Sequence, residues 1–342
     1  MKKTGKALSA LLMTAVILSG CAAPAATETT QSAETSGEAA ATENTTEAES
    51  TAGDSSLEKI VVTYVTSPLN ILSIVEKNQK MFENAFSEAG LPVEYAEITS
   101  GADQTQALAS GDVQFLYAVG GSSVVLSAAN GADIKILNMY SRSPKAFCMY
   151  TSDESLTTPE SLKGKTIVGP VGTNLHELLA AYLATADMTM DDVNFMNMSI
   201  ADAKSALASK NADVALLAGA AAYQADQEGY QLVTNGEGLI DAIIAVAVTD
   251  KFYQENPEIV ATFQSAEEDV MKFVGENHEE AVSEAAAELD LDSQAVEDMY
   301  QFYDFSMETT DKDIEGLQRT ADFMLEAGMI DHAVDVSGLF LK

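Results

Sequence analysis

The sequence predicts an α/β protein, and three observations support this. Short runs rich in β-branched residues alternate with helix-length segments over residues 57–248. Gly, Pro, Ser and Asn separate these runs at turn positions. Residues 251–342 then carry apolar side chains at helical spacing. Strands that alternate with helices favour a mostly parallel sheet with helices on both faces.

Each expected element follows from its local composition. The expected strands are rich in Val, Ile and other apolar residues and lie at residues 60–66, 93–98, 113–118, 134–139, 147–151, 166–169, 193–198, 212–217, 230–234 and 242–248. The expected helices follow Ser, Asn or Gly and lie at about residues 70–88, 100–110, 121–130, 174–185, 200–210 and 220–228, with a short helical piece near 158–165. From Lys251 onward the chain is expected to be helical almost to its end.

The first 21 residues resemble the signal peptide of a bacterial lipoprotein. Lys2, Lys3 and Lys6 precede an apolar run that ends at Leu18, too short to remain as a membrane-spanning helix. Cys21 follows Leu-Ser-Gly directly, which is similar to a lipobox. The resemblance implies cleavage after residue 20 and diacylation of Cys21, with chains such as palmitate, on the outer face of the cell membrane. The alternative is a plain signal peptide with an incidental cysteine.

Residues 22–56 read as a tether between this anchor and the body. They are almost entirely Ala, Thr, Ser, Glu and Gly, with seven acidic residues and no basic or aromatic one. Such a composition cannot bury enough apolar surface to offset its ordering entropy, so we expect disorder. A flexible coil of this length reaches about 30–35 Å.

Charge and cysteine content exclude some classes of function. Removing the three signal-peptide lysines takes the net charge from −35 to −38, which argues against nucleic-acid binding. With Cys21 lipidated, only Cys148 remains, in an apolar run where a buried, inert thiol is expected. Residues 57–342 are long enough for two lobes, contain no obvious linker, and hold no further apolar run of membrane-spanning length.

Several short motifs follow one another along residues 57–342. They are Ala107-Leu108-Ala109-Ser110-Gly111-Asp112-Val113, Ser161-Leu162-Lys163-Gly164-Lys165-Thr166-Ile167-Val168, Gly172-Thr173-Asn174-Leu175-His176-Glu177-Leu178-Leu179, Ala203 to Val214, and Ala321 to Ile330 with Val334-Asp335-Val336. Together they resemble the binding proteins of ABC importers for sulfonate, taurine, nitrate and pyrimidine precursors. The resemblance covers nearly the whole body.

This resemblance implies a periplasmic-binding-protein type II fold, with two α/β lobes and a helical C-terminal tail. One lobe would comprise about 57–142 and 245–342, and the other about 145–240. The lobes would close by hinge motion over a small polar or anionic solute. The resemblance also implies a separate permease and ATPase as partners, and we expect a monomer without a cofactor or bound metal.

Three helix starts are expected to face the cleft between the lobes, at Ser100-Gly101, Gly120-Gly121-Ser122-Ser123 and Gly172-Thr173-Asn174. Glycine admits close backbone approach, hydroxyls add donors, and helix N-termini favour anionic oxygen. Such residues also cap helices everywhere, so each start alone favours capping. Ser67, Pro68 and Gly219 complete the expected ligand contacts around these helix starts.

Two charged or titratable residues are further candidates for ligand contact. Arg142, one of only two arginines, lies at the expected crossover, where its guanidinium could grip an anion. It could equally be an exposed hinge arginine or pair with one of the many acids. His176 occupies the family's histidine position. It could donate to a ligand oxygen or stack on a ligand ring, or it could be a helix-surface residue bonded to the neighbouring lobe.

The absence of Trp separates this chain from many relatives, which carry one after the strand equivalent to 214–217. Here small residues stand at 218–222, followed by Tyr223 as a partial substitute. The sequence contains no zinc-protease, P-loop or dinucleotide motif, and it lacks the cysteine-rich motif of the pyrimidine-synthesising enzymes of this fold. A binding protein is therefore expected. An enzyme of that group and a ligand-presenting sensory lipoprotein are the alternatives.

Overall fold

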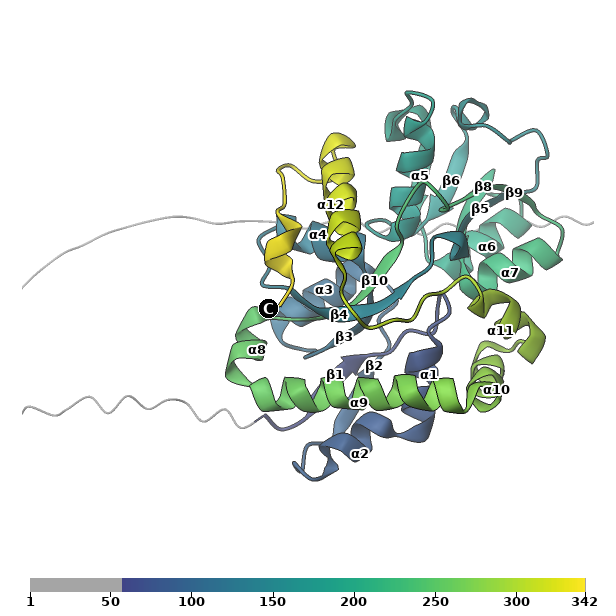
Figure 1. Cartoon of the computed structure of the whole chain (residues 1–342). Helices are drawn as coiled ribbons and strands as arrows, with labels where there is room; N and C mark the ends of the chain where they lie inside the picture. The colour runs from purple at the N-terminus through teal and green to yellow at the C-terminus, as the bar shows by residue number, and fades with distance from the viewer. Residues whose placement is uncertain (1–56, 342) are drawn as a thin grey trace, which may run out of the picture. The chain divides into compact units, whose positions relative to one another are not determined.

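The computed structural model describes residues 57–341, which belong to one unit, Ser55–Lys342 (Figure 1). The expected signal peptide, the lipidated Cys21 and the acidic tether lie outside the described residues. None of the helices within residues 57–341 is long and apolar enough to cross a membrane.

The first group of strands combines early and late segments of the chain. Strand β1 (Ile60–Thr63) pairs in parallel with β2 (Val93–Ala96), and Val62 bridges to Phe115 just before β3 (Leu116–Gly120). Strand β10 (Ile243–Val248) lies between β3 and β4 (Lys135–Arg142) and is antiparallel to both. Every residue of β10 is buried, as expected for an apolar strand that has neighbours on both sides.

The second sheet has the order β7–β6–β8–β5–β9. Its strands are β5 (Phe147–Thr151), β6 (Thr166–Gly169), β7 (Asn194–Asn197), β8 (Val214–Ala218) and β9 (Gln231–Asn235). Strand β6 is parallel to β7 and β8, whereas β5 is antiparallel to β8 and β9.

The prediction of a mostly parallel sheet is therefore wrong for the strands at the crossovers. Strand β5 follows β4 after only a short 3₁₀ turn, Pro144–Ala146, and β10 follows β9 across residues 236–242. A parallel neighbour in the same sheet requires a long return connection, usually a helix. These strands arrive from the other sheet without one, so their direction is not constrained to be parallel.

Helices cover both faces of the sheets (Figure 1). They are α1 (Ile71–Gln79), α2 (Met81–Ser87), α3 (Gly101–Ser110), α4 (Gly121–Ala129), α5 (Asn174–Ala184), α6 (Ile200–Ala208), α7 (Gly219–Gln227), α8 (Asp250–Glu255), α9 (Pro257–Glu276), α10 (His278–Leu289), α11 (Ser293–Tyr300) and α12 (Asp311–Glu326). Short 3₁₀ turns also occur at Pro159–Leu162, Met190–Asp192 and Val336–Leu339.

The helix predicted over residues 70–88 is divided at Lys80, whose φ is +55°. Neither Gly nor Pro marks this break in the sequence. The turn directs α2 toward α9, where the rings of Phe82 and Phe263 lie 4.5 Å apart between centroids. Packing of this fully buried aromatic pair accounts for the break better than local propensity does.

The C-terminal helices join the two halves of the body. One apolar cluster contains Phe115 and Tyr117 from the first strand group together with Phe147, Met149 and Leu216 from the second sheet. Helix α9 runs across the first strand group, and α11 contacts α7. On the opposite face α12 packs against α4 and also contacts α5.

Candidate functional site

The N-termini of α4 and α5 meet between the two sheets. Ser122 Oγ donates to Asn174 Oδ1 at 2.7 Å, and Ser123 Oγ donates to the Gly172 carbonyl at 2.8 Å. Asn174 Nδ2 donates in turn to the Ile243 carbonyl at 3.2 Å. Two helix starts that lie about fifty residues apart in the sequence are thus brought into contact.

The remaining glycines of these helix starts lie around the same contact. Gly101, the first residue of α3, lies in close contact with Ser123 of α4. A Cβ added at Gly101 would be 2.1 Å from Ser123 Oγ. Gly120 caps α4 beside Asn174, and Gly121 begins it beside Ile243. Thr173 caps α5, and its hydroxyl donates to the Pro170 carbonyl at 2.9 Å. We call Gly101, Gly120, Gly121, Ser122, Ser123, Gly172, Thr173 and Asn174 the helix-terminus cluster.

A second contact joins the loop before α1 to the start of α7. The Pro68 carbonyl lies directly against the Cα of Gly219, where an added Cβ would be 1.7 Å from the Pro68 oxygen. The Ser67 carbonyl accepts a hydrogen bond of 3.3 Å from Asn70 Nδ2, which also bonds to the Val65 carbonyl at 2.7 Å. Tyr223 of α7 is only partly buried. Partial burial, Asp298 of α11 and Asp292, which caps that helix, raise its pKa.

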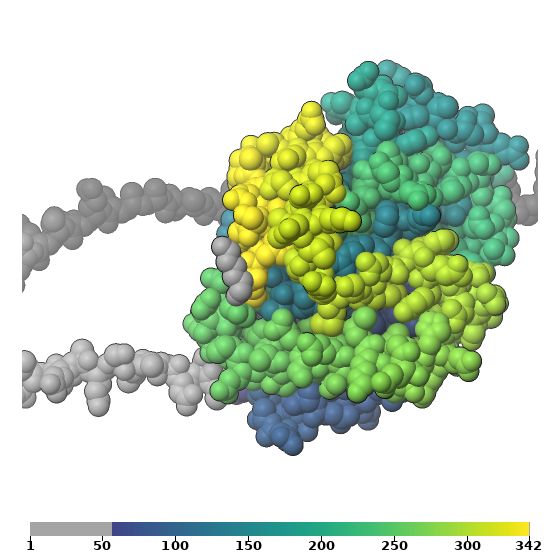
Figure 2. All heavy atoms as spheres, viewed as in Figure 1, coloured from purple at the N-terminus to yellow at the C-terminus, as the bar shows by residue number. Residues whose placement is uncertain are grey.

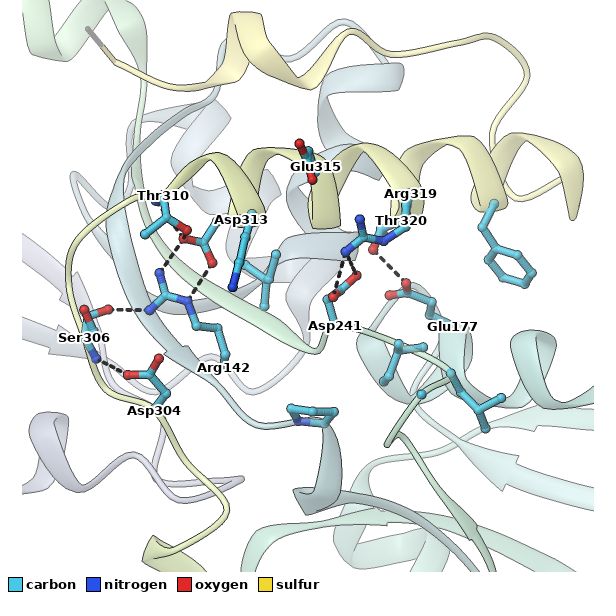
Figure 3. Close-up of a pocket in the computed structure, with 17 residues that line it drawn as sticks. Arg142, Glu177, Asp241, Asp304, Ser306, Thr310, Asp313, Glu315, Arg319 and Thr320 are labelled. Carbon is cyan, nitrogen blue, oxygen red and sulfur yellow. Dashed lines mark hydrogen bonds and ion pairs between the residues drawn. The ribbon is translucent and has the colours of Figure 1, made fainter.

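Arg142 is engaged by the C-terminal segment (Figure 3). Its Nε and Nη2 donate to the two carboxylate oxygens of Asp313 at 2.6 and 2.7 Å. Nη1 and Nη2 also donate to the carbonyls of Ser306 and Glu308. Burial alone would raise the pKa of Asp313, but the hydrogen bonds from Arg142 and Thr310 outweigh it and hold this pKa below its usual range. The arrangement corresponds to the acid-partner alternative left open by the sequence.

His176 lies one turn into α5 and supports the loop that precedes the helix. Its Nδ1 accepts the Gly172 backbone N–H at 3.2 Å, and its ring stacks on Phe195 with centroids 4.8 Å apart. Burial lowers the pKa of His176, so the imidazole is neutral at pH 7. His176 therefore shapes the Gly172 turn of the helix-terminus cluster.

A cavity of about 890 Å³ opens beside the crossovers, where α12 faces Glu177 of α5 and the segment 238–243 that leads into β10 (Figures 2 and 3). Arg142 is the one predicted binding residue on its wall. Across it Thr320 Oγ1 of α12 donates to Glu177 Oε1 of α5 at 2.8 Å. Arg319 Nη2 bonds both oxygens of Asp241 at 3.0 and 3.1 Å.

Glu177 was not singled out from the sequence. Its side chain is 4 % exposed, and burial raises its pKa to about 7, although the Thr320 hydrogen bond acts in the opposite direction and Asp241 adds to the rise. An acidic residue in the first turn of a helix ordinarily favours the helix dipole and remains in water. Leu175, Leu178 and Leu179 surround Glu177 in the sequence and are buried in α5. This apolar surrounding was the available sign that Glu177 is buried as well.

Neither thiol chemistry nor a metal centre fits the described residues. Cys148 is buried, its Sγ donates to the Lys145 carbonyl at 3.4 Å, and burial raises the pKa of its thiol to about 12, so it is an inert core residue. Within residues 57–341, no group of three or more His, Cys, Asp or Glu side chains could hold a metal ion.

Comparison with solved structures shows that the fold is shared. The alkanesulfonate-binding protein SsuA from Xanthomonas axonopodis pv. citri, bound to MOPS, superposes with a TM-score of 0.75 at 20% identity, over 83% of this chain and 98% of that one. A mutant of DszB in complex with biphenyl-2-sulfinic acid superposes with a TM-score of 0.58 at 17% identity, over 82% and 96%. The chain therefore has the two-lobed α/β periplasmic-binding-protein fold.

Sequence comparison gives relatives of the same kind. A protein from Bacillus subtilis (strain 168), provisionally named an aliphatic sulfonates-binding protein, is 26% identical over 282 residues, covering 81% of this chain and 83% of its own. The family described as NMT1/THI5 like matches residues 83–281, more than half of the chain. The chain belongs to the NMT1/THI5-like family.

Proposed function

We propose that the protein is the extracytoplasmic solute-binding lipoprotein of an ABC importer. It captures a small polar or anionic organic solute between two lobes and delivers it to a permease that works with an ATPase. Residues 57–142 with 245–342 form one lobe and residues 145–240 the other. Cys21 carries the lipid anchor, and the protein acts as a monomer.

The observation that carries this proposal is the helix-terminus cluster. Two helices of nine and eleven residues point their N-termini at the same place from different sheets. Free backbone N–H groups at such ends favour oxygen atoms with negative charge. Ser122, Ser123 and Asn174 add hydroxyl and amide groups that now bond across the junction. A solute with polar oxygens would exchange these bonds for its own.

The chemistry of the site favours a solute that does not require a free guanidinium. Arg142 already bonds to Asp313 and two backbone carbonyls, and the neutral His176 accepts a backbone N–H. Recognition would therefore rest on helix ends, hydroxyls and amides. Sulfonates, taurine, nitrate and pyrimidine-like solutes all offer suitable oxygens, and the sulfonate-binding relatives support the first of these classes.

Thermal unfolding in the presence of single solutes tests the proposal. A panel of sulfonates, taurine, nitrate, pyrimidines and flavins is added to the full chain. A true ligand at about 100 times its Kd stabilises the folded state by about 2.7 kcal/mol, which raises Tm by roughly 5 °C. Conversion of the stabilising solute into a product would instead favour an enzyme.

A matched pair of asparagine variants shows whether the response comes from the cluster. Asn174→Ala removes the amide at the start of α5 and should abolish the Tm increase. Asn130→Ala removes an amide at the other end of α4, which bonds only locally, to the Leu126 carbonyl. This variant should still show the Tm increase. Equal responses of the two variants would locate binding elsewhere.

A further inference from the structure

Backbone atoms of the two proposed lobes approach each other closely at one point. Gly219 begins α7 with a φ of +55°, and a Cβ there would lie 1.7 Å from the carbonyl oxygen, 2.2 Å from the carbonyl carbon and 2.6 Å from the Cα of Pro68. None of these atoms belongs to a flexible side chain. Only glycine at position 219 permits the present separation.

Neither side of this contact can easily move by itself. Gly219 follows β8, whose residues are all fully buried, and Ala222 and Ala225 are buried within α7. Pro68 is followed by the buried Leu69, and the side chain of Asn70 ties its loop to the Val65 carbonyl. Because both segments are anchored in their own cores, a collision between them is relieved most readily by moving one lobe away from the other.

Other bonds between the lobes depend on the same separation. Ser122 bonds to Asn174 at 2.7 Å, and Thr320 bonds to Glu177 at 2.8 Å. An O–H···O hydrogen bond rarely exceeds about 3.0 Å between its heavy atoms, so these bonds break if the lobe that carries α7 moves about 0.5 Å or more away from the other lobe. The backbone contact therefore sets how far the cleft closes.

We propose that Gly219 is a positioning residue for closure, which admits the Pro68 carbonyl and so permits the helix-terminus cluster to form. Any side chain at this position holds the lobes apart. This role rests on the proposed function, because closure serves to retain a solute. It also gives a physical reason for the glycine within the run of small residues at 218–222.

A matched glycine separates this role from backbone strain alone. Gly229 lies just beyond the end of α7 with a φ of +82°, and an added Cβ there meets nothing within 4 Å. Gly229→Ala and Gly219→Ala therefore impose a similar left-handed backbone penalty. Only Gly219→Ala adds the collision with Pro68.

Cross-linking of the closed state measures the effect without a ligand. The full chain, with Cys21→Ser to prevent other thiol reactions, carries Ser122→Cys and Asn174→Cys, whose native side chains are 2.7 Å apart. The rate at which diamide, a two-electron oxidant, joins the two thiols in a disulfide reports how often the lobes close. Gly219→Ala should slow this rate at least tenfold, whereas Gly229→Ala should leave it within twofold. Equal rates in the two variants would overturn the proposal.

A second pair keeps the test decisive if Gly219→Ala does not fold. With Gly219 intact, Ser67→Cys and Ala220→Cys flank the backbone contact and should cross-link within one molecule; absence of this product contradicts the contact. Neither experiment needs a solute. Slowed cross-linking without any solute response would therefore reject the import function alone, and unchanged cross-linking with a solute response would reject the closure role alone.

Discussion

Among single residues, Arg142 has two possible roles, to bind an anionic solute or to pair with an acidic side chain. In the structure its guanidinium pairs with Asp313. This is the least exposed ion pair within residues 57–341, with side chains 16% and 7% accessible. The pair ties the end of β4 to the start of α12, and Arg142 also holds the carbonyls of Ser306 and Glu308. Arg142 therefore holds residues 306–313 against the end of β4, where the chain crosses to the second sheet.

Arg142→Ala should therefore destabilise the protein. Removing one partner of a buried pair leaves an uncompensated charge on Asp313, so we expect the free energy of unfolding to fall by about 3 kcal/mol. Urea unfolding at pH 7 measures this. Arg319→Ala is the control, because its pair with Asp241 is 61% and 40% exposed and should contribute less than about 1 kcal/mol. Similar losses for both arginines would contradict the structural role.

Glu267 is a second residue whose burial gives a prediction, in this case a dependence on pH. It is 2% exposed in α9; burial raises its pKa to about 8, opposed by the hydrogen bond from Asn138 and increased by Glu268. In the unfolded chain the carboxyl ionises near its usual pKa. Its contribution to stability is thus fully present below about pH 4.5 and is lost as pH rises toward 8.

Glu267→Gln should raise the free energy of unfolding at pH 8 and change it little at pH 4.5. Urea unfolding at the two pH values checks this. Glu276→Gln makes the same change at an exposed position of the same helix and serves as the control. A Glu267→Gln effect that is the same at both pH values would contradict burial of a protonated carboxyl.

Among the helices, α5 and α12 are joined by the Glu177–Thr320 hydrogen bond beside the cavity (Figure 3). The charged groups near Glu177 are Asp241 from the crossover and Arg319, which pairs with Asp241, from α12. Lys312, Glu315 and the Arg142–Asp313 pair line the same cavity from α12 and β4. Because the pKa of Glu177 is raised to about 7, its neutral form is favoured in this contact at mildly acidic pH.

Contact between α5 and α12 should weaken as pH rises through 7. Hydrogen exchange of the α12 amides, corrected for intrinsic pH effects, should accelerate between pH 6 and pH 8 in the wild type. Glu177→Gln should remove this dependence, whereas Glu315→Gln, an exposed change on the same cavity wall, should retain it. Persistence of the dependence in Glu177→Gln would assign it to another group.

Across the molecule as a whole, two kinds of contact connect the first strand group to the second sheet. One is made by the starts of α4 and α5, and the other by the C-terminal helices. The α9–α11 segment joins the first strand group to α7, and α12 joins it to α5. The closure proposed above would therefore change contacts far from the helix-terminus cluster, including those that border the cavity.

Local features of this architecture could be predicted from the sequence, and long-range features could not. Ser100, Ser199 and Thr249 cap helices through bonds to residues three positions away, so their signals are local. The order of strands and helices followed from the same local signals. The family motifs identified the fold because they span the body.

The features that were missed depend on residues far apart in the chain. Arg142 and Asp313 are separated by 171 positions, and Glu177 and Thr320 by 143, so nothing near either acid reveals its partner. The antiparallel direction of β5 and β10 arises from crossing between sheets. The backbone contact of Gly219 with Pro68 likewise exists only once both lobes are assembled.

The position of a bound solute distinguishes the helix-terminus cluster from the neighbouring cavity, and a crystal structure with the most stabilising solute would reveal it. We predict that the solute lies between the N-termini of α4 and α5, with its oxygen atoms bonded to Ser122, Asn174 or the first backbone N–H groups of these helices. A solute bound instead in the cavity lined by Arg319 and Asp241, with the helix-terminus cluster unchanged, would overturn the proposed binding site.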